Sequence, residues 1–229
     1  MDTPGAPQTA RARVRAELTR EIKDVARRQL GESGAAALSL RAVARELGMV
    51  SSAVYRYFPS RDELLTALII DAYEAVGAVA TKAEKKIKRT DLLGRWMATA
   101  RAVRTWAIAH PQEYALIFGS PIPGYQAPRD TIDPASRIPL LILGFVNDRG
   151  EVASEEIRIP RSVRADLRTI GEQAASAAGD AQLARGLMAW SELIGLISFE
   201  LFGHLHNVIH DFKAHFDFQM QGVGARLGL

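Results

Sequence analysis

Hydroxyl, guanidinium and phenol side chains gather between residues 39 and 61, around two short helical patterns separated by Gly48. The donors and small residues of this block are Ser39, Arg41, Ser51, Ser52, Ala53, Tyr55, Arg56, Tyr57 and Arg61. Hydroxyl and guanidinium donors suit phosphate oxygens, and hydroxyls also reach base edges. Small residues at a helix start let its backbone approach a groove floor. The block therefore predicts contact with nucleic acid; the alternative is a small helical subdomain in which Gly48 only ends a helix.

Apolar periodicity supplies the helices that would position this block. Apolar residues at spacings of three and four predict an amphipathic helix from Arg11 to Leu30. Ser39 is the predicted N-cap of a two-turn helix, and Ser51 or Ser52 the cap of the next. Ser60 caps a fourth helix, with acidic residues in its first turn. Two short helices joined by a glycine-containing turn predict a helix-turn-helix.

The stretch from Ser39 to Leu65, SLRAVARELGMVSSAVYRYFPSRDELL, resembles the DNA-binding domain of the tetracycline-repressor (TetR) family of bacterial transcriptional regulators. The matching residues are Ser39, Arg41, Val43, Ala44, Gly48, Ala53, Val54, Tyr55, Arg56, Tyr57, Phe58, Ser60, Arg61, Leu64 and Leu65. The resemblance covers about residues 14–65, and beyond it length and helical character match. A weaker likeness to the last long helices of one subgroup covers the stretch from Trp190 to His204.

The resemblance implies a role for each residue of the block. The recognition helix corresponds to Ser51 through Tyr57, and residues 51–53 stand where the family touches bases. The residues implied to hold the DNA backbone are Ser39, Arg41, Tyr55, Tyr57 and Arg61. No side chain at 51–53 makes a bidentate contact to guanine or adenine, so base specificity would rest on Arg41, on methyl contacts from Ala53, or on DNA shape.

Composition restricts the other classes of function. The chain has 229 residues, no cysteine and a net charge of +3. Residues 1–61 hold 11 basic and 6 acidic side chains, so the first quarter is the basic end. The missing cysteines exclude disulfides, thiol nucleophiles and cysteine-ligated metals. No Walker, dinucleotide-binding or HExxH motif is present, so we expect neither an enzyme nor a cofactor.

The sequence also predicts a cytoplasmic protein without a membrane partner. The longest apolar-rich run, Leu187 to Phe202, contains two glutamates and is shorter than the roughly 20 residues that a bilayer span needs. The first ten residues lack the apolar core of a signal peptide.

Large side chains in the second part of the chain predict a cavity for a small hydrophobic effector. They are Trp96, Met97, Arg101, Tyr114, Phe118, Trp190, Glu192 and Phe199. Arg101, Tyr114 or Glu192 would anchor a polar group of the effector. The alternative is that these rings form an ordinary core. The resemblance implies a pocket among helices at 90–118, 135–147 and 182–202. Five prolines argue against a regular helix between residue 119 and Ala135 or Pro139.

The last two predicted helices carry the expected dimer interface. The helix from Gln182 to Leu205, capped by Asp180, is apolar nearly all round and must be covered on both sides. With a last helix from Val208 to about Met220, the resemblance implies a four-helix interface between two copies. His204, His206 and His210 cluster at a spacing that a metal could use, although we expect no metal site.

The sequence as a whole predicts an all-α protein with an N-terminal three-helix, helix-turn-helix DNA-binding domain. The predicted parts are a flexible arm at 1–12, this domain at 13–62, and a larger helical effector-binding and dimerisation domain at 63–229. The expected function is a ligand-responsive repressor that binds a palindromic operator as a homodimer. Arg11, Arg13 and Arg15 would form an arm into the minor groove or a solubilising tail. The alternative functions are a helical small-molecule-binding or carrier protein without regulated DNA binding, and a helical protein-interaction adaptor.

Overall fold

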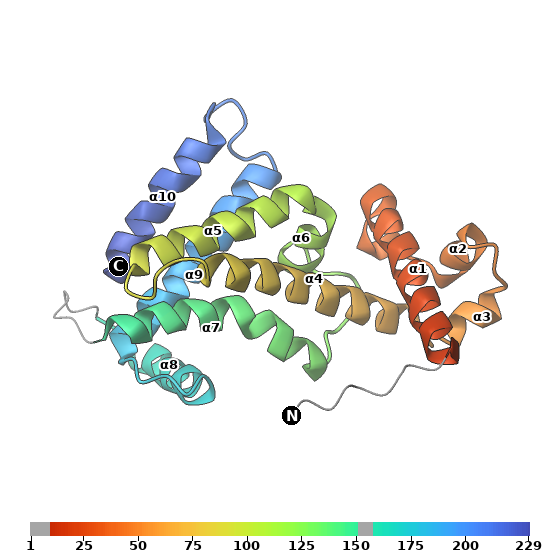
Figure 1. Ribbon diagram of the computed structural model, residues 1–229, viewed down its shortest axis with the longest axis horizontal. Coiled ribbons are helices and arrows are strands. Elements are labelled where there is room, and N and C mark those ends of the chain that lie inside the picture. Colours follow the sequence, from red (N-terminus) through yellow and green to blue (C-terminus); the bar gives the residue numbers. More distant parts are fainter. Residues whose placement is uncertain (1–9, 151–157) are drawn as a thin grey trace. The chain divides into compact units, whose positions relative to one another are not determined.

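The computed structural model describes residues 10–150 and 158–229, and these residues form helices and connecting turns without a strand (Figure 1). The all-α prediction is therefore confirmed. The chain divides into two compact units. The first comprises the residues up to Ile69 together with Ser120–Pro128, and the second comprises Ile70–Gly119 together with Arg129–Leu229.

The first unit is built from short helices around a small apolar core. Its helices are α1 (Ala10–Ser33), the 3-10 turn η1 (Ala35–Ala37), α2 (Leu40–Glu46), α3 (Ser51–Tyr55) and the beginning of α4 (Arg61–Glu84). Its buried apolar side chains are Ile22, Val25, Ala26, Leu30, Leu38, Leu40, Val43, Ala44, Val54, Phe58, Leu64, Leu65, Leu68 and Ile69. Their spacing of three and four along each helix is the predicted pattern.

Two of the three predicted serine caps are confirmed. The Ser39 hydroxyl accepts from the Ala42 N–H at 3.5 Å, and the Ser60 hydroxyl accepts from the Glu63 N–H at 3.1 Å. The prediction that Ser51 or Ser52 caps the third helix is wrong, because Val50 is the N-cap and makes no side-chain bond. Ser51 and Ser52 are instead the first two residues of α3, and neither side chain caps the helix.

Helix α1 begins at Ala10, so Arg11, Arg13 and Arg15 lie on its first turns rather than ahead of it. The predicted arm at 1–12 is thus helical from Ala10 onward, and its remainder lies outside the described residues. The guanidinium of Arg15 stands over the Tyr57 ring at 5.1 Å, which ties the start of α1 to the end of the α3 region.

The proline-rich segment Ser120–Pro128 belongs to the first unit although it lies far along the chain. The Tyr125 hydroxyl is 2.9 Å from the Thr66 hydroxyl on α4, at hydrogen-bond distance. The sequence predicted only that this segment is irregular, because its composition does not indicate which surface it packs against.

The second unit is a helical bundle around a larger core. Besides the remainder of α4 it contains α5 (Leu92–Ala109), α6 (Pro111–Phe118), the 3-10 turn η2 (Arg129–Thr131), α7 (Ile132–Arg149), α8 (Arg161–Gln173), α9 (Asp180–Leu201) and α10 (Phe212–Leu227). Helix α9 packs against α5, α7, α8 and α10. The largest fully buried side chains of this core are Trp96, Tyr114, Phe145 and Phe216.

The predicted bounds of the helices α7, α9 and α10 are wrong. Helix α7 begins at Ile132 and contains Pro139. Pro134 is tolerated because the first helical N–H groups have no intrahelical partner. Helix α9 is preceded by Gly179 as its N-cap, rather than by Asp180, and ends at Leu201. Helix α10 begins only at Phe212, where the Asp211 carboxylate accepts from the Ala214 N–H at 2.8 Å. The polar sequence from Asn147 to Pro160 predicts an irregular excursion, but its first three residues instead end α7. Residues 151–157 of this stretch lie outside the described residues.

Helix α4 is the one helix of the described chain that is long and apolar enough to cross a bilayer, by length and composition alone. The apolar run singled out from the sequence was the later one, in α9. The buried side chains of α4 lie in the two cores: Leu64, Leu65, Leu68 and Ile69 in the first, and Ala72, Val76 and Ala80 in the second. Helix α4 is thus apolar because it supplies a wall to both cores.

Candidate nucleic-acid interface

The turn between α2 and α3 is set by Gly48, as the sequence predicted. Gly48 has a φ of 66°, a conformation that favours glycine. The Met49 N–H donates to the Ala44 carbonyl at 2.8 Å, and the Gly48 N–H donates to the Arg45 carbonyl at 3.2 Å. This pair of bonds is a Schellman ending, which stops α2 and redirects the chain into α3.

Helix α3 presents small and hydrogen-bonding side chains outward. Val54 is fully buried and fixes the inner face of the helix. Ser52, Tyr55 and Arg56 are exposed, whereas Ser51, Ala53 and Tyr57 are half-buried. The outward side of α3 therefore combines hydroxyl, phenol and guanidinium donors, which is what groove and phosphate contact requires.

Three arginines near α3 are exposed and have no ion pair within the described residues: Arg41, Arg45 and Arg56. The nearby Arg28 is engaged, since its guanidinium donates to Glu46 at 2.7 Å. That hydrogen bond lowers the pKa of the Glu46 carboxyl. The unpaired arginines leave positive charge available for a polyanion, and Arg45 was missed because its position on a helix predicted only solvation.

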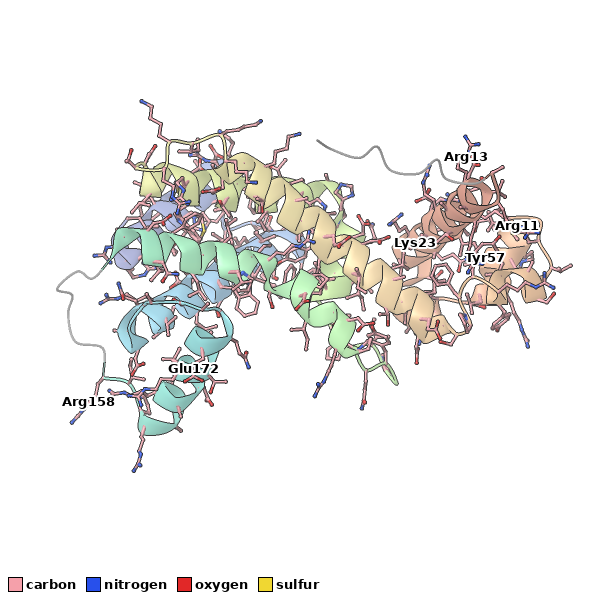
Figure 2. All side chains as sticks on the ribbon, turned by 60° about the horizontal axis from the view of Figure 1, so that its bottom comes forward. Arg11, Arg13, Lys23, Tyr57, Arg158 and Glu172 are labelled. Atoms are coloured by element: carbon pink, nitrogen blue, oxygen red, sulfur yellow. The ribbon has the colours of Figure 1, made fainter. Side chains whose placement is uncertain are left out.

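Three residues assigned to the DNA backbone also hold the first unit together. The Arg61 Nη2 donates to the Ala35 carbonyl at 2.8 Å and to the Ala36 carbonyl at 3.3 Å, and its Nη1 lies 3.4 Å from Asp62. Tyr57 is covered by Arg15, and Ser39 caps α2. Figure 2 shows Tyr57 with Arg11 and Arg13 at the same end of the first unit. These contacts position α3.

The eight predicted effector-binding residues do not come together at the apolar cavity or at the basic groove described below. Trp96 and Met97 are core residues, and the Trp96 indole N–H donates to the Met220 carbonyl at 2.7 Å. Tyr114 is fully buried, and its hydroxyl donates to the Ile194 carbonyl at 2.7 Å. Burial raises the pKa of Tyr114 to about 12, although the hydrogen bond with Ser198 acts against this.

The other predicted effector-binding residues form ion pairs or pack against aromatic rings. Arg101 pairs with Asp217 at 2.8 Å, and Glu192 pairs with Arg226. Phe118 packs against the rings of Tyr73 and Tyr114, with centroid distances of 5.9 and 5.1 Å. Phe199 is about half exposed and lies beside the His204 ring. Only Trp190 of the eight lies at a cavity described below.

A small apolar cavity lies between α7, α8 and α9. Its volume is about 40 Å³, and its lining residues are Pro139, Leu143, Ile170, Leu183, Gly186, Leu187 and Trp190. The Trp190 indole nitrogen is buried and has no hydrogen-bond partner among the described residues. A buried N–H without a partner is rare in folded proteins and is a donor available to a ligand. The sequence pointed to Trp190 but not to α8, whose apolar residues are few.

The three clustered histidines do not lie on a helix. His204, His206 and His210 occupy the turns between α9 and α10, where Asn207 has a φ of 64°. His206 and His210 are four residues apart, a spacing that would bring them onto one face of a helix, but no helix is present here. Within residues 10–150 and 158–229, no three side chains of the metal-ligating types come together.

Comparison with known proteins adds a second line of observation. A family model described as "Bacterial regulatory proteins, tetR family" matches residues 22–68, and one described as "Tetracyclin repressor-like, C-terminal domain" matches residues 96–223. The HTH-type transcriptional regulator Rv1816 of Mycobacterium tuberculosis is 40% identical over 197 residues, covering 82% of each chain.

Two solved structures resemble the whole chain. The crystal structure of the regulatory protein SCO4313 matches with a TM-score of 0.79 and 36% identity, covering 94% of this chain and 98% of that one. A protein of unknown function from Rhodococcus sp. RHA1 matches with a TM-score of 0.68 over all of both chains. Because the sequence identity to this second protein is 21%, the similarity shows a shared fold and nothing about function.

Proposed function

Because the chain belongs to the tetracycline-repressor family of helix-turn-helix transcriptional regulators, and is not an enzyme, we propose that it is an effector-released repressor. In this proposal a homodimer in the cytoplasm binds a palindromic operator, and a small hydrophobic ligand releases it. The observation that carries the DNA-binding part is the outward side of α3 with its unpaired neighbours Arg41 and Arg56. Ser39, Tyr57 and Arg61 hold that helix in place.

A second copy of the chain would cover the apolar surface of α9 and α10. These helices expose the large apolar side chains Leu187, Met188, Phe199, Phe202 and Phe218, the last two lying just after α9 and within α10. Phe218 is 72% exposed, which is unusual for a side chain of its size. Two-fold pairing of this surface would give the dimer that a palindromic operator requires.

The effector would enter the cavity between α7, α8 and α9 and accept a hydrogen bond from the Trp190 indole. The cavity is smaller than such a ligand, so α8 must move outward on binding. Helix α4 supplies residues to both units and is the natural carrier of the change. A ligand that binds the opened state better would shift the population away from the DNA-binding state.

In vitro selection from random duplex DNA tests the DNA-binding part. We expect a palindromic consensus, with affinity that falls steeply as salt rises. Arg41→Ala and Arg56→Ala would each reduce the slope of log K against log salt by about one. The matched control is Arg161→Ala on α8, an exposed arginine of the second unit. Absence of any consensus at low salt would favour the carrier-protein alternative.

Binding of the fluorescent apolar probe 1-N-phenylnaphthylamine tests the effector cavity. Ile170→Trp fills the cavity and should abolish the fluorescence increase. Val163→Trp on the same helix is the control, because Val163 is exposed and does not line the cavity. Equal binding by both variants would place the effector elsewhere.

A further inference from the structure

An open basic groove lies along the C-terminal part of α4, in the second unit. It has a volume of about 580 Å³ and is lined by Gly77, Ala78, Thr81, Lys82, Lys85, Lys86 and Arg137. Arg137 comes from α7 and the other residues from α4 and the turn after it. The groove is separate from the apolar cavity, with which it shares no lining residue.

Gly77 allows Arg137 to lie across α4. A Cβ at this position would stand 2.8 Å from the Arg137 Cδ and 3.0 Å from its Cβ, so any larger residue must displace the arginine. The Arg137 guanidinium is then held by Glu74 at 3.3 Å. Gly77 and Ala78 have small side chains that leave space in the groove, and Arg137 lines the groove beside them.

The lysines of the groove lack anionic partners. Lys82, Lys85 and Lys86 are exposed, and none of them has an ion pair in the described part of the chain. Glu84 stands between them in sequence but turns inward, where its carboxylate accepts from Arg95 at 2.5 Å. Among the described residues, Glu74 is therefore the one acidic side chain that pairs with a cation of the groove, which has four cations.

This arrangement places four cations along one open groove. Several like charges side by side raise the local concentration of an anion. Lysine ammonium groups bind phosphate as point charges, and an arginine fork adds directed hydrogen bonds. The Thr81 hydroxyl already donates its one proton to the Gly77 carbonyl at 2.8 Å, so the four cations and not this hydroxyl would hold the anion. The groove thus suits an anion with several charged oxygens and not an apolar effector.

We propose that this groove binds the phosphate chain of a small phosphorylated molecule. Its volume lies in the range of small-molecule sites, whereas duplex DNA presents its phosphates along an extended surface. Lys82, Lys85 and Lys86 neutralise the phosphate oxygens, and Arg137 closes one side. The chain therefore carries an anion site in addition to the α3 surface.

Calorimetric titration of the full chain with inorganic tripolyphosphate at low salt tests the proposal. We expect saturable binding of one tripolyphosphate per chain that sulfate at matched ionic strength does not reproduce. Lys82→Ala combined with Lys86→Ala should weaken binding about tenfold or more. The control, Arg158→Ala combined with Arg161→Ala, removes two exposed cations that do not line the groove, the first of which Figure 2 labels, and should bind as the unaltered chain does.

Gly77→Ala provides a test that changes no charge. It displaces Arg137 and should weaken tripolyphosphate binding several-fold, and Arg137→Gln should do the same without crowding α4. A thermal melt of each variant verifies that it is folded. Equal weakening by the control pair, or unaltered binding in both Lys82→Ala/Lys86→Ala and Arg137→Gln, overturns the proposal. Tight binding of a random-sequence duplex that tripolyphosphate does not compete with, and that the lysine variant loses, would assign the groove to nucleic acid instead.

Discussion

The two units use arginine in opposite ways. Around α3 in the first unit, Arg41, Arg45 and Arg56 are exposed and have no carboxylate partner among the described residues. On α5 in the second unit, all three arginines pair with carboxylates. Arg95 bonds to Glu84 and Asp148, Arg101 to Asp217, and Arg104 to Glu200 in a bidentate pair at 2.6 and 2.7 Å. The same residue type is thus left available to an anionic partner near α3 and holds the fold together on α5.

These two groups of arginines carry the same charge and differ in whether a carboxylate is bound to it. Arg95 is 3% exposed, and its guanidinium also lies over the Phe145 ring at 5.1 Å. A buried cation of this kind is held by carboxylates because its desolvation would otherwise be prohibitive. An exposed arginine without a partner costs little and keeps its charge available for phosphate. The groove of Lys82, Lys85 and Lys86 resembles the first unit in this respect.

The largest expected effect is that of Arg95→Met. It leaves the buried Glu84 carboxylate without its cation and leaves Asp148 paired with Arg89 alone. We expect the free energy of unfolding of the second unit to fall by roughly 3–5 kcal/mol, measured by urea denaturation. Arg56→Ala, which removes an unpaired arginine, should change stability by less than about 0.5 kcal/mol. Similar losses in both variants would contradict the division between the two uses of arginine.

A smaller effect is expected from Arg61→Ala, which sharpens the comparison within the first unit. Arg61 donates to the Ala35 and Ala36 carbonyls, so its removal frees η1 from α4. We expect a loss of roughly 1–2 kcal/mol in stability. The salt slope of operator binding should stay closer to that of the unaltered chain than in Arg56→Ala. A reduction of the slope by a full unit, with unchanged stability, would make Arg61 a direct phosphate contact.

Local signals made the first unit predictable. The Ser39 cap, the glycine at 48 and the cap at Ser60 act over three or four residues, and periodic apolar residues fixed the inner face of each helix. The exposed side of α3 follows from the same periodicity, because Val54 must point inward. The exception is the start of α3, where serine was expected to be a cap and is instead a first helical residue.

The second unit was less predictable because its contacts join residues far apart in sequence. The Trp96 indole donates a hydrogen bond to the Met220 carbonyl, and the Tyr114 hydroxyl donates one to the Ile194 carbonyl. No local sequence pattern contains either pair. The sequence alone therefore could not distinguish aromatic residues of the core from aromatic residues that would line a ligand cavity. The position of Ser120–Pro128 on the first unit and the crossing of Arg137 over Gly77 are equally non-local.

A still smaller effect separates serines that cap from serines that present a hydroxyl. Ser39→Ala removes the acceptor for the Ala42 N–H, through a long bond of 3.5 Å. We expect a loss of roughly 0.5–1 kcal/mol in the free energy of unfolding, at the low end for a cap. Ser52→Ala, at an exposed position, should leave stability unchanged and alter operator affinity alone. Differential melting of the two variants in the same buffer measures this, and an equal loss would make Ser52 structural.

The smallest effect is a pH dependence carried by Arg101 and Asp217. The hydrogen bond from Arg101 holds the pKa of the Asp217 carboxyl below its ordinary value, against the opposing effect of burial. Because the folded-state pKa is the lower one, the pair stabilises the fold above the unfolded value of about 3.9, and this contribution is lost as pH falls through the folded-state pKa. Arg101 is half exposed, so solvent screening limits the contribution to about 0.2–1 kcal/mol. Arg101→Ala should therefore lower stability slightly at pH 7 and not at all near pH 2, measured by urea denaturation at both values. A loss that is the same at both pH values would show that Arg101 acts by packing and that its pairing with Asp217 contributes nothing.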